Sequence, residues 1–307
     1  MRGIDEARKL YDDYGRDMIR SFFPEYEERI AVGLAGHGSQ CFGFDDDISR
    51  DHDFQSGFCL WLTDVDDIKI GAELQSAYLT IPANSSGGRS LMGDTAVGVR
   101  RTGFFYSRYL GSEGAPESWR QWMSIPSWAL AEAVNGQVFR DDLGEFSAVR
   151  SALLTGMPED VRKKKLAARA FTMAQAGQYN YTRCLRHGEE GAAMLAVSEF
   201  VSAGADMIYL LNRRHMPYYK WALRGMDSLE TLSDMRYPLE FLLTGPNDGP
   251  GQELKAGVIE DVSAAVIKEL TAQGLTDSCQ DFLEPHAYEI TERIQDPEIR
   301  EMNISEG

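Results

Sequence analysis

The chain has 307 residues and a formal net charge of −17, and 43% of its residues are apolar. This length accommodates one large domain or two ordinary ones, with enough apolar residues for a packed core. The acidic balance disfavours a nucleic-acid substrate, because proteins that bind nucleic acids usually carry a basic surface. We judge the apolar runs too short for the roughly 18 residues of a membrane span, so no membrane association is expected.

The cysteines and the N-terminal residues indicate the compartment. The four cysteines are scattered and form no CxxC pair, which argues against a disulfide framework or a zinc ribbon. Residues 1–20 mix charged and apolar side chains at helical spacing and lack the apolar stretch of a signal peptide. We therefore expect a cytoplasmic protein.

The first third of the chain alternates helical and extended patterns, as an α/β domain does. A strand that runs into the Gly36-His37-Gly38-Ser39 turn is the clearest of these patterns. Thr63 or Asp64 is expected to cap the helix that follows the second strand. The expected elements are a helix over 5–22, a strand over 30–35, a strand within 51–62, a helix from 63 or 64 to 78, and a strand over 97–101.

From about residue 124 onward the pattern is helical. Asn135-Gly136 is a helix stop, and an extended pair at 138–139 and a turn at 141–144 follow it. We expect an α+β fold with two domains, an α/β domain with a small mixed sheet over 1–123 and a helical bundle over 124–307. The expected helices of the bundle cover 158–186, 191–213, 253–272 and 277–293.

The most informative motif is Gly38-Ser39, followed after eleven intervening residues by Asp51-His52-Asp53. A Gly-Ser pair on a tight turn can place a backbone amide and a hydroxyl against a phosphate. Asp51 and Asp53 would share one face of a strand, because side chains alternate along it. Two such carboxylates with phosphate oxygens suit Mg²⁺. A solvated acidic loop is the alternative, since Asp45–Asp53 contains five aspartates.

Other phosphate and metal motifs do not match this segment. The loop lacks the glycine and the closing glutamate of an EF-hand. The chain has no GxxxxGK[ST] P-loop, no GxSxG nucleophile elbow and no kinase signature. A metal phosphohydrolase that uses His37 with His52-Asp53 is disfavoured, because such sites need histidines on helices. Nucleotide-triphosphate chemistry remains the best interpretation.

Gly38-Ser39-x-x-x-Gly43 with Ser49-Arg50-Asp51-His52-Asp53-Phe54 resembles the signature of the polymerase-β-like nucleotidyltransferase superfamily. The resemblance covers residues 30–62 directly. More closely, the chain resembles an uncharacterised bacterial family that is related to the minimal and antibiotic nucleotidyltransferases. Residues 177–180 and 217–221 look like the helical half of that family, so this closer resemblance spans most of the chain.

The resemblance implies a role for each matching residue. Gly38 and Ser39 would hold the triphosphate, with Arg50 as a further nucleotide contact, and Asp51 and Asp53 would bind metal and serve catalysis. His52 stands where an apolar residue is usual. A third carboxylate, which commonly comes from a neighbouring strand, is not evident; the candidates are Asp94, Asp141 and Glu145.

The helical half carries three further features. The basic run at 162–165, with Arg169, is expected to be the solvated first turn of a helix. Lys220 lies among Tyr218, Tyr219 and Trp221 and is a candidate for binding the β or γ phosphate, the alternative being a lysine whose stem packs on aromatic faces. Gly177 indicates a close approach by a ligand or another helix. The polar residues near it suit ligand binding and interhelix hydrogen bonding equally.

These observations favour a metal-dependent nucleotidyltransferase with Mg²⁺ or Mn²⁺ as cofactor. It would move a nucleoside monophosphate, with ATP as the expected donor, to a hydroxyl of a small-molecule or protein acceptor. A catalytically silent nucleotide-binding or sensing protein on the same fold is the alternative, which the missing third acid favours.

Overall fold

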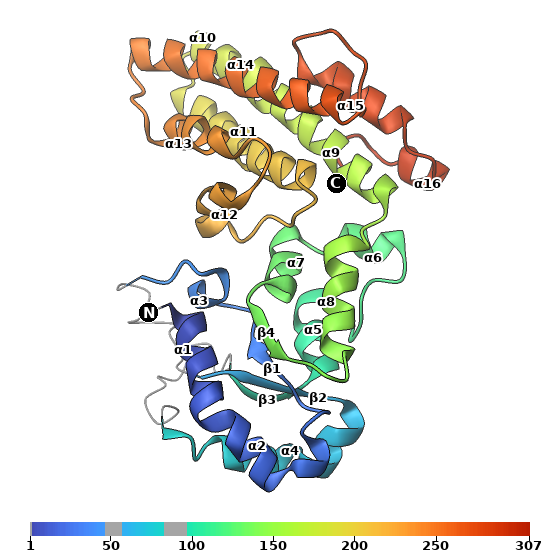
Figure 1. The fold of residues 1–307 in the computed structure, drawn as a ribbon. Helices are drawn as coiled ribbons and strands as arrows, with labels where there is room; N and C mark the ends of the chain where they lie inside the picture. Colours follow the sequence, from blue (N-terminus) through green and yellow to red (C-terminus); the bar gives the residue numbers. More distant parts are fainter. Residues whose placement is uncertain (1, 47–56, 83–96) are drawn as a thin grey trace. The chain divides into compact units, whose positions relative to one another are not determined.

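The structure is a computed structural model of the chain and describes residues 2–46, 57–82 and 97–307. It confirms the expected α+β class: the chain is 66% helical and contains a small four-stranded mixed sheet. The chain divides into two compact units, which Figure 1 labels by element. The first unit comprises Met1–Ser118 and Ala129–Gly156, and the second comprises Trp119–Trp128 and Met157–Gly307.

The sheet lies in the first unit and has the strand order β3-β2-β1-β4. β1 is antiparallel to both β2 and β4, whereas β2 and β3 are parallel. All residues of β1 and β2 are buried, as expected for central strands that are covered on both faces. The strands are β1 (Ala31–Leu34), β2 (Cys59–Leu62), β3 (Gly98–Arg101) and β4 (Gln137–Arg140).

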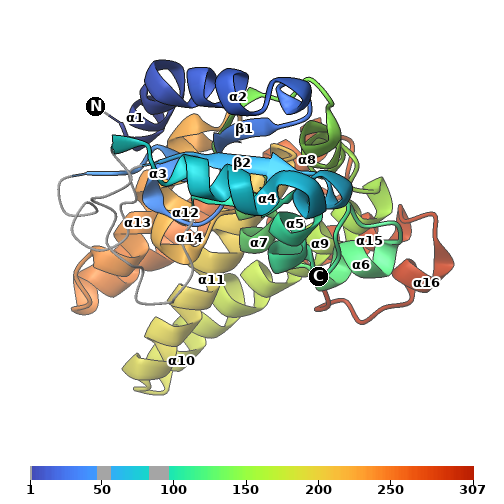
Figure 2. The same ribbon diagram turned by 90° about the horizontal axis from the view of Figure 1, so that it is seen from below.

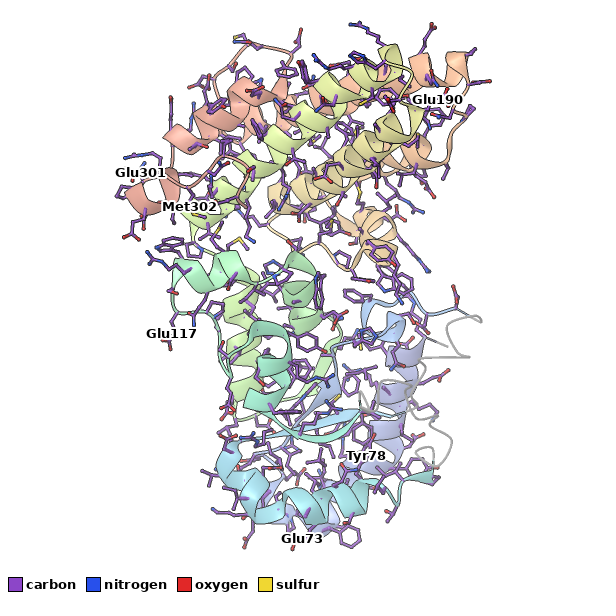
Figure 3. All side chains as sticks on the ribbon, turned by 180° about the vertical axis from the view of Figure 1, so that it is seen from behind. Glu73, Tyr78, Glu117, Glu190, Glu301 and Met302 are labelled. Carbon is purple, nitrogen blue, oxygen red and sulfur yellow. The ribbon has the colours of Figure 1, made fainter. Side chains whose placement is uncertain are left out.

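Helices cover both faces of this sheet (Figures 1 and 2). On one face Phe58 packs against the rings of Tyr11 and Tyr78, the latter labelled in Figure 3. On the other face Trp61 stacks on Phe146 with ring centroids 3.8 Å apart. The helices of this unit are α1 (Gly3–Leu10), a π-helical turn (Tyr11–Gly15), α2 (Arg16–Phe22), α3 (Ser39–Phe42), α4 (Asp64–Tyr78), α5 (Thr102–Leu110) and α8 (Glu145–Thr155), with α7 (Ser127–Val134) crossing into it from the second unit.

The boundary between the units differs from the single expected boundary at 123/124. β4 pairs with β1, with Leu34 opposite Gln137, so residues 129–156 return to the first unit. The sequence predicted the extended segment at 138–139. It did not predict the partner, because strand pairing across a hundred residues depends on long-range contacts and not on local pattern.

The second unit is a bundle of helices whose core is formed by α9, α11, α14 and α15. Gly177 lies in a π-helical segment, and a Cβ there would lie 2.3 Å from the Phe200 ring, so the close approach is that of another helix. Gln178 bonds Glu260 and the backbone of Asp281 and Leu283. The helices are α6 (Trp119–Ser124), α9 (Glu159–Met173), the π-helical segment (Ala174–Tyr181), α10 (Thr182–Arg186), α11 (Glu190–Leu211), α12 (Tyr219–Gly225), α13 (Arg236–Thr244), α14 (Gly249–Ala272), α15 (Leu283–Glu292) and α16 (Pro297–Arg300).

One helix of this bundle, α11, is long and apolar enough to span a membrane by length and composition alone. However, 67% of its most apolar 18-residue window is buried inside the fold. Burial of that kind is equally expected of the central helix of a bundle, so the helix is weak evidence for a membrane.

Candidate functional site

The Gly38–Ser39 pair lies on a tight turn (residues 36–39, here the Gly-Ser turn) between β1 and α3. Gly36 and Gly38 have φ angles of +108° and +115°, which residues with a Cβ rarely adopt. A Cβ on Gly36 would lie 2.6 Å from the Tyr109 hydroxyl. A Cβ on Gly38 would meet only Gln40 Cγ among the described residues, at 3.9 Å, so none of them closes the turn beside Gly38.

Side chains of the first unit hold the Gly-Ser turn in this shape. The Asn135 side chain accepts a hydrogen bond from Gly36 N at 2.7 Å and donates one to Gly36 O at 2.7 Å. The Tyr109 hydroxyl accepts from His37 N at 3.0 Å. These bonds satisfy backbone groups that the tight turn removes from the sheet, and they fix the turn independently of any ligand.

The strand register shows which segments lie at the same end of the sheet as the Gly-Ser turn. Gly33, near the end of β1, is opposite Cys59, the first residue of β2. Leu34 is opposite Gln137, and Cys59 is opposite Gly98. The N-terminal ends of β2, β3 and β4 therefore all lie at the end of the sheet where β1 enters the turn.

The predicted metal ligands Asp51 and Asp53 and the predicted nucleotide contact Arg50 lie outside the described residues, as does Asp94. Within 2–46, 57–82 and 97–307, no group of three or more His, Cys, Asp or Glu side chains is arranged to hold a metal ion. Asp51 and Asp53 therefore remain predictions from the sequence.

The other two candidates for a third carboxylate lie at the opposite end of the sheet. Asp141 and Glu145 follow β4, whose last residue, Arg140, pairs with Val32 near the start of β1. Asp141 accepts hydrogen bonds from two backbone amides at the start of α8, at 2.9 and 2.8 Å. Burial and the nearby Asp64 carboxylate raise the pKa of Glu145. Asp141 organises a helix start, and neither side chain is placed to serve the Gly-Ser turn.

A buried glutamate beside the Gly-Ser turn was missed by the sequence analysis. Glu132 on α7 is 6% exposed, and its Oε1 lies 3.3 Å from Nδ1 of His37. The His37 side chain is 62% exposed, so a buried carboxylate holds one side of an accessible imidazole. The available signal was a single acid within the apolar run Ala129–Val134, since a charged residue is rarely buried without a partner.

Lys220, the predicted phosphate contact, belongs to the second unit and lies in the first turn of α12. It is exposed, and its Nζ lies 5.0 Å from the centre of the Trp221 ring. Tyr218 and Tyr219 pack on each other with centroids 4.4 Å apart. The observed contact is a cation–π pair, which is worth about 0.5–1 kcal/mol at an exposed site.

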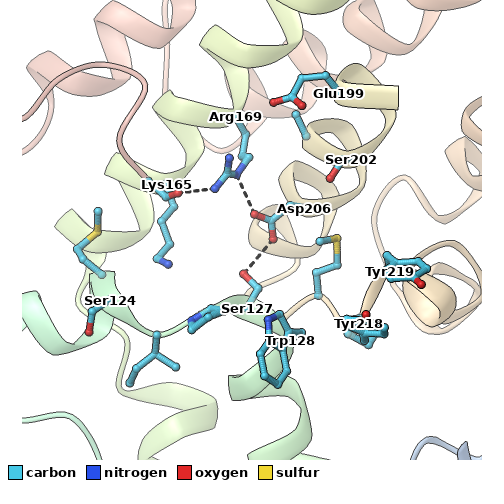
Figure 4. Close-up of a pocket in the computed structure, with 17 residues that line it drawn as sticks. Ser124, Ser127, Trp128, Lys165, Arg169, Glu199, Ser202, Asp206, Tyr218 and Tyr219 are labelled. Carbon is cyan, nitrogen blue, oxygen red and sulfur yellow. Dashed lines mark hydrogen bonds and ion pairs between the residues drawn. The ribbon is translucent and has the colours of Figure 1, made fainter. Parts of the chain in front are cut away.

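The second unit contains a cavity of about 390 Å³ between α6, α9, α11 and the segment before α12 (here the helical-unit pocket). Figure 4 shows a polar chain along it. Ser127 Oγ donates to Asp206 Oδ1 at 3.1 Å, and Arg169 Nε donates to Asp206 Oδ2 at 2.8 Å. Trp128 and Tyr218 form an aromatic wall, with centroids 6.3 Å apart at 81°.

The expectation that the basic run at 162–165 is solvated is wrong. Arg162, Lys164 and Lys165 are 4%, 0% and 5% exposed, because α15, α11 and α16 pack around α9. Arg162 pairs with Glu159, and Lys164 Nζ donates to the carbonyl oxygens of Met302 and Asn303. Figure 3 labels Met302 at this position.

Lys165 differs from its neighbours in the basic run. It lines the helical-unit pocket, and among the described residues its Nζ has no hydrogen bond or ion pair. Burial lowers the pKa of Lys165, while Asp206 opposes that shift. The Nζ atom itself is open to the cavity, whereas the rest of the Lys165 side chain is buried, so the amine faces the cavity without a direct partner among the described residues.

Comparison with known proteins gives one match. A family model described as a domain of unknown function, DUF4037, matches residues 122–222, about a third of the chain. No curated protein matches, and no solved structure matches. The matched segment starts after the Gly-Ser turn in sequence, and it includes every residue that lines the helical-unit pocket except Gly307.

Proposed function

We propose that this chain is a metal-dependent nucleotidyltransferase. It moves a nucleoside monophosphate, AMP in the expected case, from a nucleoside triphosphate to a hydroxyl of a small-molecule or protein acceptor. The observation that carries the proposal is the Gly-Ser turn, a fixed turn with an open glycine at the end of β1. The N-terminal ends of the three other strands lie at the same end of the sheet. In sequence, Asp51 and Asp53 come between that turn and β2.

In the proposed reaction the acceptor oxygen attacks the α-phosphorus, and the bond from that phosphorus to the oxygen bridging it to the β-phosphate breaks. Pyrophosphate leaves, and a base takes the proton of the acceptor hydroxyl. Asp51 and Asp53 would hold Mg²⁺ or Mn²⁺, which would supply neutralising charge to the triphosphate. The Gly38 amide and the Ser39 hydroxyl hold phosphate oxygens, with Arg50 as a further contact.

His37 is our candidate for the base in this reaction. Its Nδ1 faces the buried Glu132 carboxylate at 3.3 Å, which favours the tautomer with a proton on Nδ1 and leaves Nε2 as the proton acceptor. In this proposal His37 takes the place of the third carboxylate that is common in the resembling superfamily and is not evident in this sequence.

A second function is a nucleotide-binding protein without catalysis. The placement of Asp141 and Glu145 at the far end of the sheet favours it, because those two acids then supply no base at the Gly-Ser turn. Both proposals require nucleotide binding at the turn, and they differ only in turnover.

The test uses NTPs that are labelled at the α-phosphate, with Mg²⁺ and an extract of the source cell that contains small molecules and macromolecules. Wild type is compared with Asp51→Asn/Asp53→Asn and with Asp64→Asn, a control at the opposite end of the sheet. We expect label on a new species with wild type and with the control, and none with the double variant. Equal transfer by the double variant would refute the assignment. Binding of NTP without transfer would leave the silent alternative.

The role of His37 is tested in the same assay once an acceptor is found. Glu132→Gln should lower the rate of transfer by about tenfold to a hundredfold, within the usual range for general base catalysis, and should shift the pH profile. Glu145→Gln is the matched control and should leave the rate unchanged. An unchanged pH profile in Glu132→Gln would remove His37 from the mechanism.

A further inference from the structure

The helical-unit pocket has the features of a small-molecule site that is separate from the Gly-Ser turn. Its volume of about 390 Å³ lies within the roughly 300–1,000 Å³ of such sites. It combines an aromatic wall, several hydroxyl groups and a buried amine. Every described residue that lines it belongs to the second unit.

Lys165 indicates that a molecule bound in the pocket carries a hydrogen-bond acceptor. Only 5% of the residue is exposed, and its side chain extends from α9 toward the segment of Ser124 and Ser127 (Figure 4). Lys164, the next residue, shows how this fold satisfies a buried amine, with two backbone carbonyls at 3.2 and 2.6 Å. Lys165 has no such acceptor among the described residues. An acceptor from outside the chain would complete it.

The charges around the pocket favour an acceptor with a single negative charge over one with two negative charges. The Arg169 guanidinium is already paired with Asp206 and also donates to the Gly307 carbonyl. Glu199, on α11, contributes a second carboxylate to the lining. The lining thus carries two cations, Lys165 and Arg169, and two carboxylates, Asp206 and Glu199. Lys165 is the cation without a direct acceptor among the described residues, and a dianionic phosphate would be repelled by the two carboxylates more strongly than a monoanion.

The aromatic wall indicates the rest of the molecule. Trp128 and Tyr218 are 43% and 41% exposed, although they pack against each other at one side of the pocket. Exposed aromatic faces in a pocket favour a planar ring, which gains contact area at low cost in entropy. The hydroxyl groups of Ser124 and Ser202 lie on the lining as further polar contacts.

We propose that the helical-unit pocket binds a small aromatic monocarboxylate, whose carboxylate pairs with Lys165 and whose ring packs on Trp128 and Tyr218. This site is independent of the proposed nucleotidyl transfer. The pairing is a charge-assisted hydrogen bond in a buried setting, which is stronger than the same contact in water.

The test uses benzoate as the probe, with benzyl alcohol and phenyl phosphate as the neutral and dianionic analogues. Binding to the full-length chain is measured by chemical-shift perturbation and calorimetry. Benzoate should bind more tightly than either analogue. Lys165→Met should weaken benzoate binding at least tenfold, whereas Lys164→Met, the matched control, should change it less than twofold. Trp128→Leu should weaken it as well.

The pH dependence is a second readout. Benzoate binding should weaken as the pH rises through the lowered pKa of Lys165, because the neutral amine no longer pairs with the carboxylate. The other charged or titratable groups that line the pocket are Arg169, Asp206, Glu199, Tyr218 and Tyr219. The Lys165→Met variant should lack this pH dependence.

A third measurement needs no variant. Reductive methylation of wild type, followed by peptide mass spectrometry, should show that benzoate protects Lys165 and leaves the labelling of exposed Lys220 unchanged. Absence of benzoate binding, tighter binding of phenyl phosphate, or unchanged binding in Lys165→Met would each overturn the proposal. Protection of Lys165 by benzoate would support it even if Lys165→Met failed to fold.

Discussion

Replacing the two adjacent buried lysines of α9 one at a time should have opposite effects on stability. Methionine keeps the length and the apolar stem of lysine and has a similar helix propensity, so each change mainly removes the amine. Lys164→Met takes the donor from the carbonyl oxygens of Met302 and Asn303. Lys165→Met removes an amine that has no partner among the described residues.

The expected change in the free energy of unfolding depends on the hydrogen-bond partners of each amine. Loss of the two Lys164 hydrogen bonds should lower the free energy of unfolding by about 1–3 kcal/mol, since the freed carbonyl groups are only partly solvated. Lys165→Met should raise it by about 0–2 kcal/mol, because the cost of desolvating a charge disappears. Urea denaturation of each variant, followed by tryptophan fluorescence and circular dichroism, measures the difference.

The pH dependence of the free energy of unfolding shows whether the effect of Lys165→Met comes from loss of the amine or from a change in packing. Burial lowers the folded-state pKa of Lys165 below its ordinary value of 10.5, so wild type carries a penalty at neutral pH that fades as the pH rises toward 10.5. The advantage of Lys165→Met over wild type should fade over the same range. Equal destabilisation by both variants, without this dependence, would refute the view that Lys165 is an unsatisfied amine.

Two further predictions concern the packing of the chain. Gly177→Ala should destabilise the second unit by about 1–2 kcal/mol in urea denaturation, because its Cβ would overlap the Phe200 ring; Gly257→Ala on α14, whose Cβ meets nothing within 4 Å, should instead stabilise it by about 0.5–1 kcal/mol. Burial raises the pKa of Cys59 to about 11 and that of Cys41 as well. At pH 8 a thiol reagent should therefore label two of the four cysteines quickly, and rapid labelling of all four would contradict the packing of the first unit. The cysteines expected to react are Cys184 and Cys279.

The local elements were predictable because their signals are local. Thr63 caps α4 by accepting a hydrogen bond from Asp66 N at 3.1 Å, and the helix ends at Tyr78 as expected. The stop at Asn135-Gly136 and the extended residues after it became β4. The π-helical segments at Tyr11–Gly15 and Ala174–Tyr181 were not predictable, because they result from packing against neighbouring helices.

Among the site residues too, those with a local sequence signal were predictable and those that depend on tertiary packing were not. The Gly-Ser turn was recognisable since a tight turn with positive φ needs glycine, and both Gly36 and Gly38 adopt it. Glu132 and Lys165 were not, because each depends on what the fold brings to it. A basic run is ordinarily solvated, and only the helices packed around α9 turn Lys165 into a buried amine that faces a cavity.

The two proposed sites also differ in whether they lie within the segment that the family model matches. The match at 122–222 contains Trp128, Lys165, Asp206 and Tyr218, and it lacks the Gly-Ser turn. The helical-unit pocket therefore lies in the segment that the family model matches, and the nucleotidyl-transfer motif lies in a separate part of the chain. A chain with Asp51→Asn/Asp53→Asn should then still bind benzoate as wild type does. Loss of that binding would mean that the two sites act together, and the pocket would become the first place to look for the acceptor.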